Sequence, residues 1–154
     1  LADFLKIRAQ LFDSEQSLVF TNGCFDLLHP GHLQVLKQAR KLGDRLAVGL
    51  NSDASVRRIK GSDRPVDNLA TRVAKLEAVP QVGWILVFEE DTPTALIEQI
   101  RPDVLVKGGD YAPDEIVGKD IVEAYGGRVT TVRYLDGHST TGNISSRNIE
   151  QSDT

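Results

Sequence analysis

The chain has 154 residues, of which 40% are hydrophobic, and a formal net charge of −4 from 18 basic and 22 acidic residues. This balance predicts a globular domain and excludes both a disordered chain and a nucleic-acid binder with a basic stripe. No apolar run is long enough to span a membrane, the single cysteine suits the cytoplasm, and the absence of methionine indicates a chain cut from a longer polypeptide.

Apolar spacing predicts helices and strands that alternate along the chain. In chain order we expect helix 1–14, strand 18–21, helix 31–42 ended by Gly43, strand 45–50, helices 53–60 and 69–78, strand 84–88, helix 93–100, strand 103–106, helix 117–125, strand 128–132 and a closing helix after Gly142. Nearly continuous apolar strands between helices are typical of a parallel sheet that is covered on both faces. The sequence therefore predicts an α/β fold, a Rossmann-like doubly wound parallel sheet of about five strands, in a single domain over 15–154 preceded by the N-terminal helix.

The segment TNGCFDLLHPGH, residues 21–32, holds the densest chemistry of the chain. It joins the first strand to a helix, and in doubly wound sheets ligands bind at the carboxyl ends of the strands. A helix that begins near Gly31 points unsatisfied N–H groups at this crevice and predicts an anion site. His29 and His32 are three residues apart, so both imidazoles can face one phosphate. A zinc site is the weaker alternative, because too few further ligands exist, and we expect no metal held by the protein.

Three further segments carry polar residues toward the same crevice. Lys60 ends a basic stretch after the second strand, where a solvated helix end is the alternative. Lys107 precedes two glycines and Asp110 at the end of another strand, a pattern suited to a phosphate, a base and a ribose. The run Ser139–Thr141 could cap the last helix, and Ser145–Ser146 is a second candidate for that position.

On these residues, the chain resembles the HIGH-type nucleotidyltransferases, in their cytidylyltransferase-like branch. The likeness continues through LGDRLAVGLNSDASVRRIKG, RPV, FEEDTPTALIEQIRPDVLVKGGDY and DGHSTT. The whole set looks most like the heptose 1-phosphate adenylyltransferases, which occur alone or as the C-terminal half of a bifunctional heptose kinase/adenylyltransferase. The resemblance implies transfer of AMP from ATP to D-glycero-β-D-manno-heptose 1-phosphate, with Mg²⁺, to give pyrophosphate and ADP-heptose, a lipopolysaccharide precursor.

The resemblance also implies roles for individual residues. The catalytic residues would be His29, His32 and Lys60. The nucleotide would contact Cys24, Phe25, Pro30, Gly31, Gly108, Asp110, Ser139, Thr140 and Thr141, and the acceptor Asp26, Arg72 and Lys107. The expected partners are ATP and a sugar phosphate, a second copy in a homodimer, and a fused or separate sugar kinase, with neither nucleic acid nor membrane.

Three alternatives stay open at this point. The first is a cytidylyltransferase that acts on glycerol 3-phosphate or a similar small phosphate. Adenylylation of FMN or pantetheine phosphate is a second enzymatic alternative. The third is a nucleotide-sensing module without catalysis, which the joint presence of His29, His32, Lys60 and Asp110 disfavours.

Overall fold

The fold is a sheet of five parallel strands, as the sequence predicts. The computed structural model describes residues 1–109 and 115–133. The strands are β1 (Leu18–Gly23), β2 (Arg45–Asn51), β3 (Trp84–Phe88), β4 (Val104–Gly108) and β5 (Arg128–Val132), in the spatial order β3-β2-β1-β4-β5. All neighbouring strands pair in parallel, which confirms the α/β class.

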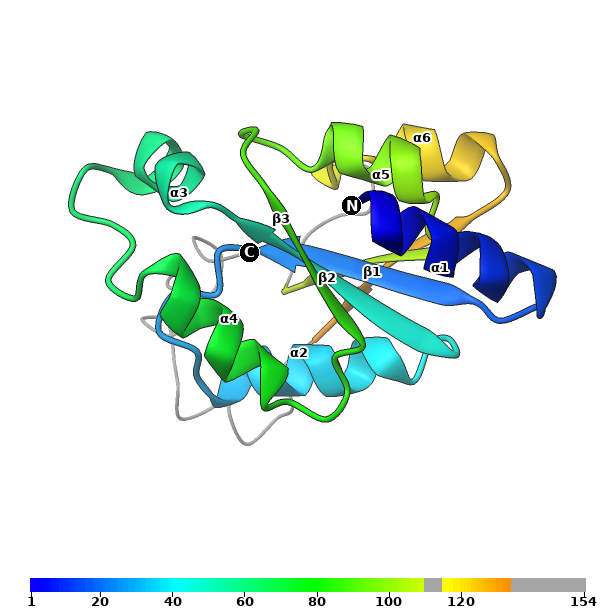
Figure 1. Ribbon diagram of the computed structural model, residues 1–154, viewed down its shortest axis with the longest axis horizontal. Helices are drawn as coiled ribbons and strands as arrows, with labels where there is room; N and C mark the ends of the chain where they lie inside the picture. The colour runs from blue at the N-terminus through cyan, green and yellow to red at the C-terminus, as the bar shows by residue number, and fades with distance from the viewer. Residues whose placement is uncertain (110–114, 134–154) are drawn as a thin grey trace.

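Helices cover both faces of this sheet (Figure 1). One face carries α1 (Ala2–Asp13), α5 (Thr94–Ile100) and α6 (Lys119–Ala124), and the other carries α2 (Pro30–Arg40) and α4 (Leu69–Glu77). The remaining helix, α3 (Asp53–Lys60), follows β2 at the carboxyl edge of the sheet. Among the described residues, no helix is both long and apolar enough to cross a bilayer.

The alternation of side chains along β1 divides the hydrophobic core into two layers. Leu18 and Phe20 join the layer beneath α1, α5 and α6, whereas Val19 joins the layer beneath α2 and α4. Helix α1 lies in the first layer through Phe4 and Leu11. Burial on both faces explains why the strands read as continuous apolar runs rather than as alternating ones.

Three strands extend further than the sequence predicts, and β2 does so by Asn51 alone. β1 continues to Gly23 and β4 to Gly108, because each glycine still pairs in the ladder, opposite Leu50 and Val132 respectively. Gly43 was expected to stop the second helix, but α2 already ends at Arg40. A Cβ at Gly43 would lie 2.6 Å from the Val19 side chain, so this glycine allows a close approach to β1.

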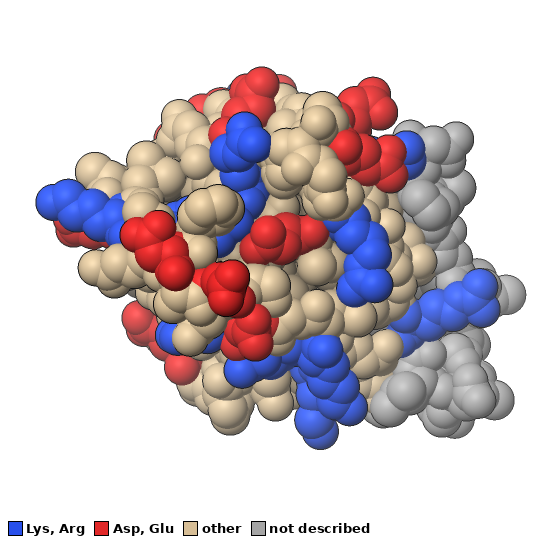
Figure 2. All heavy atoms as spheres, turned by 90° about the vertical axis from the view of Figure 1, so that its right-hand side faces the viewer, with Lys and Arg blue, Asp and Glu red and all other residues tan. Residues whose placement is uncertain are grey.

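The strand order places a switch point beside β1. From β1 the chain passes to β2 and β3 on one side and then crosses over to β4 and β5 on the other. In open parallel sheets, ligands bind at such a point, outside the carboxyl ends of the strands. The opposite end of the sheet, where the strands begin, carries acidic and basic side chains side by side (Figure 2).

Candidate functional site

The turn between β1 and α2 lies at this switch point and is tightly wound. Phe25 and Leu27 have φ angles of 48° and 54°, a left-handed conformation that non-glycine residues rarely adopt. Phe25 and Asp26 are both buried, which holds the turn in place. The turn ends at His29, the N-cap of α2.

His29 and His32 together cap the helix. His29 Nδ1 accepts a hydrogen bond from the backbone N–H of Gly31 at 3.2 Å, and His32 Nδ1 accepts one from the backbone N–H of His29 at 3.3 Å. The two rings stack with their centroids 3.8 Å apart. Phe25 packs edge-on against His32, which is fully buried. The predicted pair is therefore brought together by a reciprocal capping box.

This capping pattern assigns the imidazole tautomers. A nitrogen that accepts a hydrogen bond carries no proton, so each neutral ring keeps its proton on Nε2. Both Nε2 atoms are shielded from solvent. The pair therefore supplies two N–H donors beside the N-terminus of α2, where Pro30 occupies the first turn and adds no competing side-chain charge. Backbone dipoles and imidazole donors together form a site suited to a phosphate.

Two lysines lie toward the carboxyl ends of neighbouring elements, Lys60 on α3 and Lys107 on β4. Lys107, at the end of β4, is half-buried, and burial lowers the pKa of its ammonium group to about 8. Lys60, the last residue of α3, lowers that pKa further by repulsion, while Cys24 acts in the opposite direction. The effects of Lys60 and Cys24 on Lys107 indicate that both lie near it, although the three residues come from different segments of the chain. A buried cation is costly alone and gains strongly from a bound anion.

Gly108 has a packing role that the sequence did not reveal. A Cβ on Gly108 would lie 2.7 Å from Val35 Cγ2, on the inner face of α2. The glycine therefore lets α2 approach the end of β4. Contact with a nucleotide stays a prediction for this residue, and the same holds for Cys24, Phe25, Pro30 and Gly31, which all lie in the turn or the first helical turn of α2.

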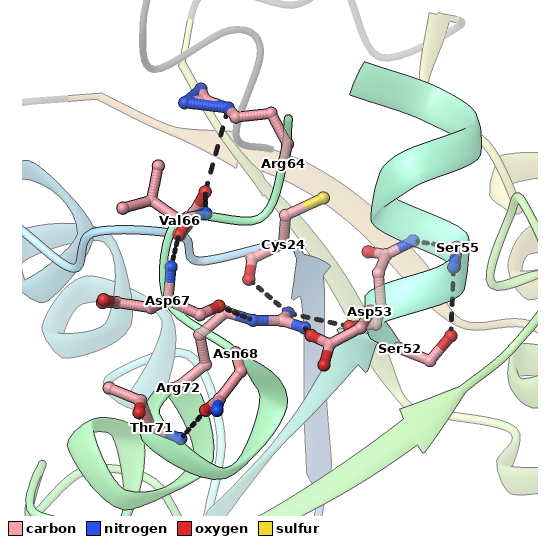
Figure 3. A network of polar contacts seen from close by, with 12 residues as sticks. Cys24, Ser52, Asp53, Ser55, Arg64, Val66, Asp67, Asn68, Thr71 and Arg72 are labelled. Carbon is pink, nitrogen blue, oxygen red and sulfur yellow. Dashed lines mark hydrogen bonds and ion pairs between the residues drawn. The ribbon is translucent and has the colours of Figure 1, made fainter. Parts of the chain in front are cut away.

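Arg72 was expected to contact the acceptor, but the structure places its guanidinium in a buried network (Figure 3). Nε donates to the carbonyl of Asp67, Nη1 donates to the carbonyls of Cys24 and Asn51, and Nη2 donates to Asp53. Four of the five N–H groups of an arginine are thus used within the protein. These contacts favour a structural role, which joins the turn after β1, the end of β2 and the loop before α4.

Asp26 also bonds to the protein itself. Its two carboxylate oxygens accept the backbone N–H groups of Val66 and Asp67, each at 2.8 Å, and the side chain is buried. The Nε atom of Arg64 lies 3.8 Å from the same carboxylate. Asp26 therefore ties the loop before α4 to the turn that leads into His29, and its predicted contact with the acceptor stays a prediction.

The remaining predicted residues lie outside the described part of the chain. They are Asp110, Ser139, Thr140 and Thr141, together with the alternative capping residues Ser145 and Ser146. The sequence alone assigns no role to Arg64. Its position four residues after Lys60, in RPV, was the available signal.

Comparison with known proteins identifies the family to which this site belongs. Residues 20–152 match the cytidylyltransferase-like family. The chain belongs to this family. The match confirms the family and the enzyme class, nucleotidyltransferase, that the sequence predicts.

Curated relatives of the chain include several bifunctional proteins. The bifunctional protein HldE of Geotalea uraniireducens (strain Rf4) is 59% identical over 127 residues, which cover 82% of this chain and 26% of the relative. HldE of Marinomonas sp. (strain MWYL1) is 54% identical over 134 residues, which cover 87% of this chain and 28% of the relative. The chain thus spans little more than a quarter of the length of these relatives.

Solved structures agree with the fold. The lipopolysaccharide core biosynthesis protein from Thermoplasma volcanium GSS1 superposes with a TM-score of 0.64 at 28% identity, over 78% of this chain and 97% of that one. A protein of unknown function from Archaeoglobus fulgidus superposes with a TM-score of 0.56 at 20% identity, over 76% of this chain and 98% of that one, and supports the fold alone.

Proposed function

We propose that the chain transfers AMP from ATP to D-glycero-β-D-manno-heptose 1-phosphate and releases pyrophosphate and ADP-heptose. The observation that carries this proposal is the identity of 50–59% to HldE proteins over most of the chain, which includes the His29–His32 cap. The likeness to a lipopolysaccharide core biosynthesis protein supports the same pathway.

The reaction needs no nucleophile from the protein. An oxygen of the acceptor phosphate attacks the α-phosphorus of ATP and forms a new P–O bond, while the bond to the bridging oxygen breaks and its electron pair leaves with pyrophosphate. The Nε2–H groups of His29 and His32 and the N-terminus of α2 would donate to the α-phosphate as charge shifts during this step. Lys60 would hold the outer phosphates and keep them aligned, and Lys107 would contact the acceptor.

Mg²⁺ is part of this proposal as an ion carried by ATP. Mg²⁺ commonly binds through one or two carboxylates plus substrate phosphates. Residues 1–109 and 115–133 contain no cluster of three or more His, Cys, Asp or Glu side chains that could hold a metal ion. When bound, it would neutralise charge on the departing pyrophosphate.

The location and the partners follow from the same proposal. We infer a cytoplasmic enzyme, in agreement with the single cysteine. We also propose that the protein forms a homodimer. In addition, we propose a sugar kinase that is fused to this chain or supplies its substrate, because the HldE relatives are bifunctional proteins.

Pyrophosphate release tests the proposal. Purified protein would be incubated with Mg²⁺, ATP or CTP, and either heptose 1-phosphate or glycerol 3-phosphate. Release with ATP and heptose 1-phosphate alone is the expected result. Release with CTP and glycerol 3-phosphate would keep the chemistry and refute the substrates, whereas ATP binding without release from any acceptor would favour the sensing module.

A further inference from the structure

The loop between α3 and α4 is fixed to the turn that carries the histidines. Asp26 binds the backbone of Val66 and Asp67 on this loop. The N–H of Arg64 donates to the carbonyl of Gly61 at 3.2 Å, so Arg64 closes a turn directly after Lys60. The loop is therefore fixed at both ends. Arg64 lies between Lys60 on one side and the Asp26-bound residues Val66 and Asp67 on the other.

Arg64 differs from Arg72 in how its side chain is engaged. Its Nε is 3.8 Å from Asp26 Oδ2, too far for a hydrogen bond, so the carboxylate attracts the guanidinium without using its donors. Within the described residues no hydrogen bond from this guanidinium is recorded, whereas Arg72 uses four donors. The side chain of Arg64 is 30% exposed. Figure 3 shows the two arginines on opposite sides of the Val66–Asp67 backbone.

A guanidinium that is partly exposed and is held by an ion pair rather than by hydrogen bonds is suited to bind a phosphate. Its planar fork can donate two parallel hydrogen bonds to phosphate oxygens, which a lysine cannot do. The strand order also separates two halves of the site. The loop of Arg64 lies on the β2 side of β1, whereas Gly108 ends β4 on the other side, where the nucleoside is expected.

We propose that Arg64 binds the phosphate group of the acceptor and that Asp26 positions Arg64 to do so. The inference deepens the proposed function and rests on it. Asp26 is a positioning residue here, because its own oxygens are bonded to the loop backbone. The assignment gives the acceptor phosphomonoester its own cation, separate from the histidine pair.

Steady-state kinetics with Arg64→Gln and Arg64→Lys test the proposal. We expect Arg64→Gln to raise KM for heptose 1-phosphate by about 10- to 100-fold, the scale of losing charge-assisted hydrogen bonds. The Kd of ATP, measured by calorimetry without acceptor, should change by less than about twofold. For Arg64→Lys, the KM for heptose 1-phosphate should fall between those of the wild-type and Arg64→Gln proteins. The matched control is Arg58→Gln, since Arg58 bonds to Asp91 in the loop after β3 and its replacement should leave both constants unchanged.

Two results would overturn the assignment of Arg64. An unchanged KM for the acceptor would show that the guanidinium does not bind it. A parallel rise in the Kd of ATP and in KM would assign Arg64 to the nucleotide instead. If wild-type protein releases no pyrophosphate from heptose 1-phosphate, the proposed function fails. Arg64 is then judged by direct titration of glycerol 3-phosphate, where equal affinity of wild-type and Arg64→Gln proteins overturns the inference.

A double-mutant cycle tests the role of Asp26. If Asp26 acts through Arg64, Asp26→Asn raises KM for the acceptor in wild-type protein but adds little in the Arg64→Gln background. Fully additive effects would show that Asp26 acts independently, and would overturn that half of the proposal.

Discussion

Replacing Arg72 with methionine separates two readings of a single residue. The sequence predicts a contact with the acceptor, whereas the structure shows a buried guanidinium with donors to Asp67, Cys24, Asn51 and Asp53. If the structural interpretation holds, Arg72→Met leaves three carbonyl groups without this hydrogen-bond donor and the Asp53 carboxylate without its ion pair. The main effect should then be on stability.

The contacts allow the size of this effect to be bounded. Removing one partner of a buried ion pair costs about 3–5 kcal/mol, which already includes some relaxation around the unpaired groups. Each stranded buried carbonyl alone would cost about 1–3 kcal/mol, but such costs do not add when the groups are neighbours. Because Asp53 is partly exposed and water can reach it, we expect about 3–4 kcal/mol. This is a large part of the roughly 5–15 kcal/mol that stabilises a typical domain.

Urea unfolding followed by circular dichroism measures the difference. The matched control is Lys75→Met, one helical turn later on α4, whose exposed ion pair with Asp67 should contribute no more than about 1 kcal/mol. An Arg72→Met protein that unfolds within about 1 kcal/mol of wild type, yet shows a large rise in KM for the acceptor, would refute the structural reading. It would restore Arg72 to the substrate site.

Three further predictions concern the site. His32→Ala should lower kcat by on the order of 10²–10³, the scale for losing one donor to the transition state. The variant should also unfold at a lower urea concentration because a buried helix cap is lost. Near-wild-type pyrophosphate release would refute the catalytic role. The pKa of Lys107 is lowered to about 8 from 10.5, so the unfolded chain binds more protons between these values. The free energy of unfolding should therefore rise over that pH range, and this component should be missing from Lys107→Met; identical pH slopes would contradict it. Gly108→Ala should destabilise the protein by about 1–3 kcal/mol, because the added Cβ would overpack against Val35. Adding Val35→Ala to this variant should restore part of the lost free energy of unfolding. Additive effects of the two substitutions would contradict the Gly108–Val35 contact.

The fold could be predicted because it depends on patterns that are local in the sequence. Each strand is a short apolar run, and helix caps such as Asn68 before α4 mark where helices begin. The strand ends were less predictable. Gly23 and Gly108 read as turn residues by type, but each continues its strand because a neighbouring strand offers the hydrogen-bond partners. Pairing of this kind depends on residues far away in the chain.

The site could be predicted in part, for a related reason. His29 and His32 were identified because their spacing and their place before a helix are visible locally. The partners of Arg72 were not, since they come from three segments up to 48 residues away. A charged residue on an amphipathic helix looks the same in a sequence whether it meets a substrate or a set of buried carbonyls. Only the tertiary contacts separate the two.

The same contacts explain why residues of this site serve stability and chemistry together. His29 and His32 close the cap of α2 through Nδ1, and this use of Nδ1 is what leaves a proton on each Nε2. The capping box is therefore also the device that orients the donors. A variant that keeps a donor but cannot cap, or caps but cannot donate, should lose one property without the other. Asparagine at position 32 can accept the backbone N–H of His29 through its side-chain oxygen while its amide N–H lies elsewhere, so it should preserve folding better than alanine and restore little of the turnover.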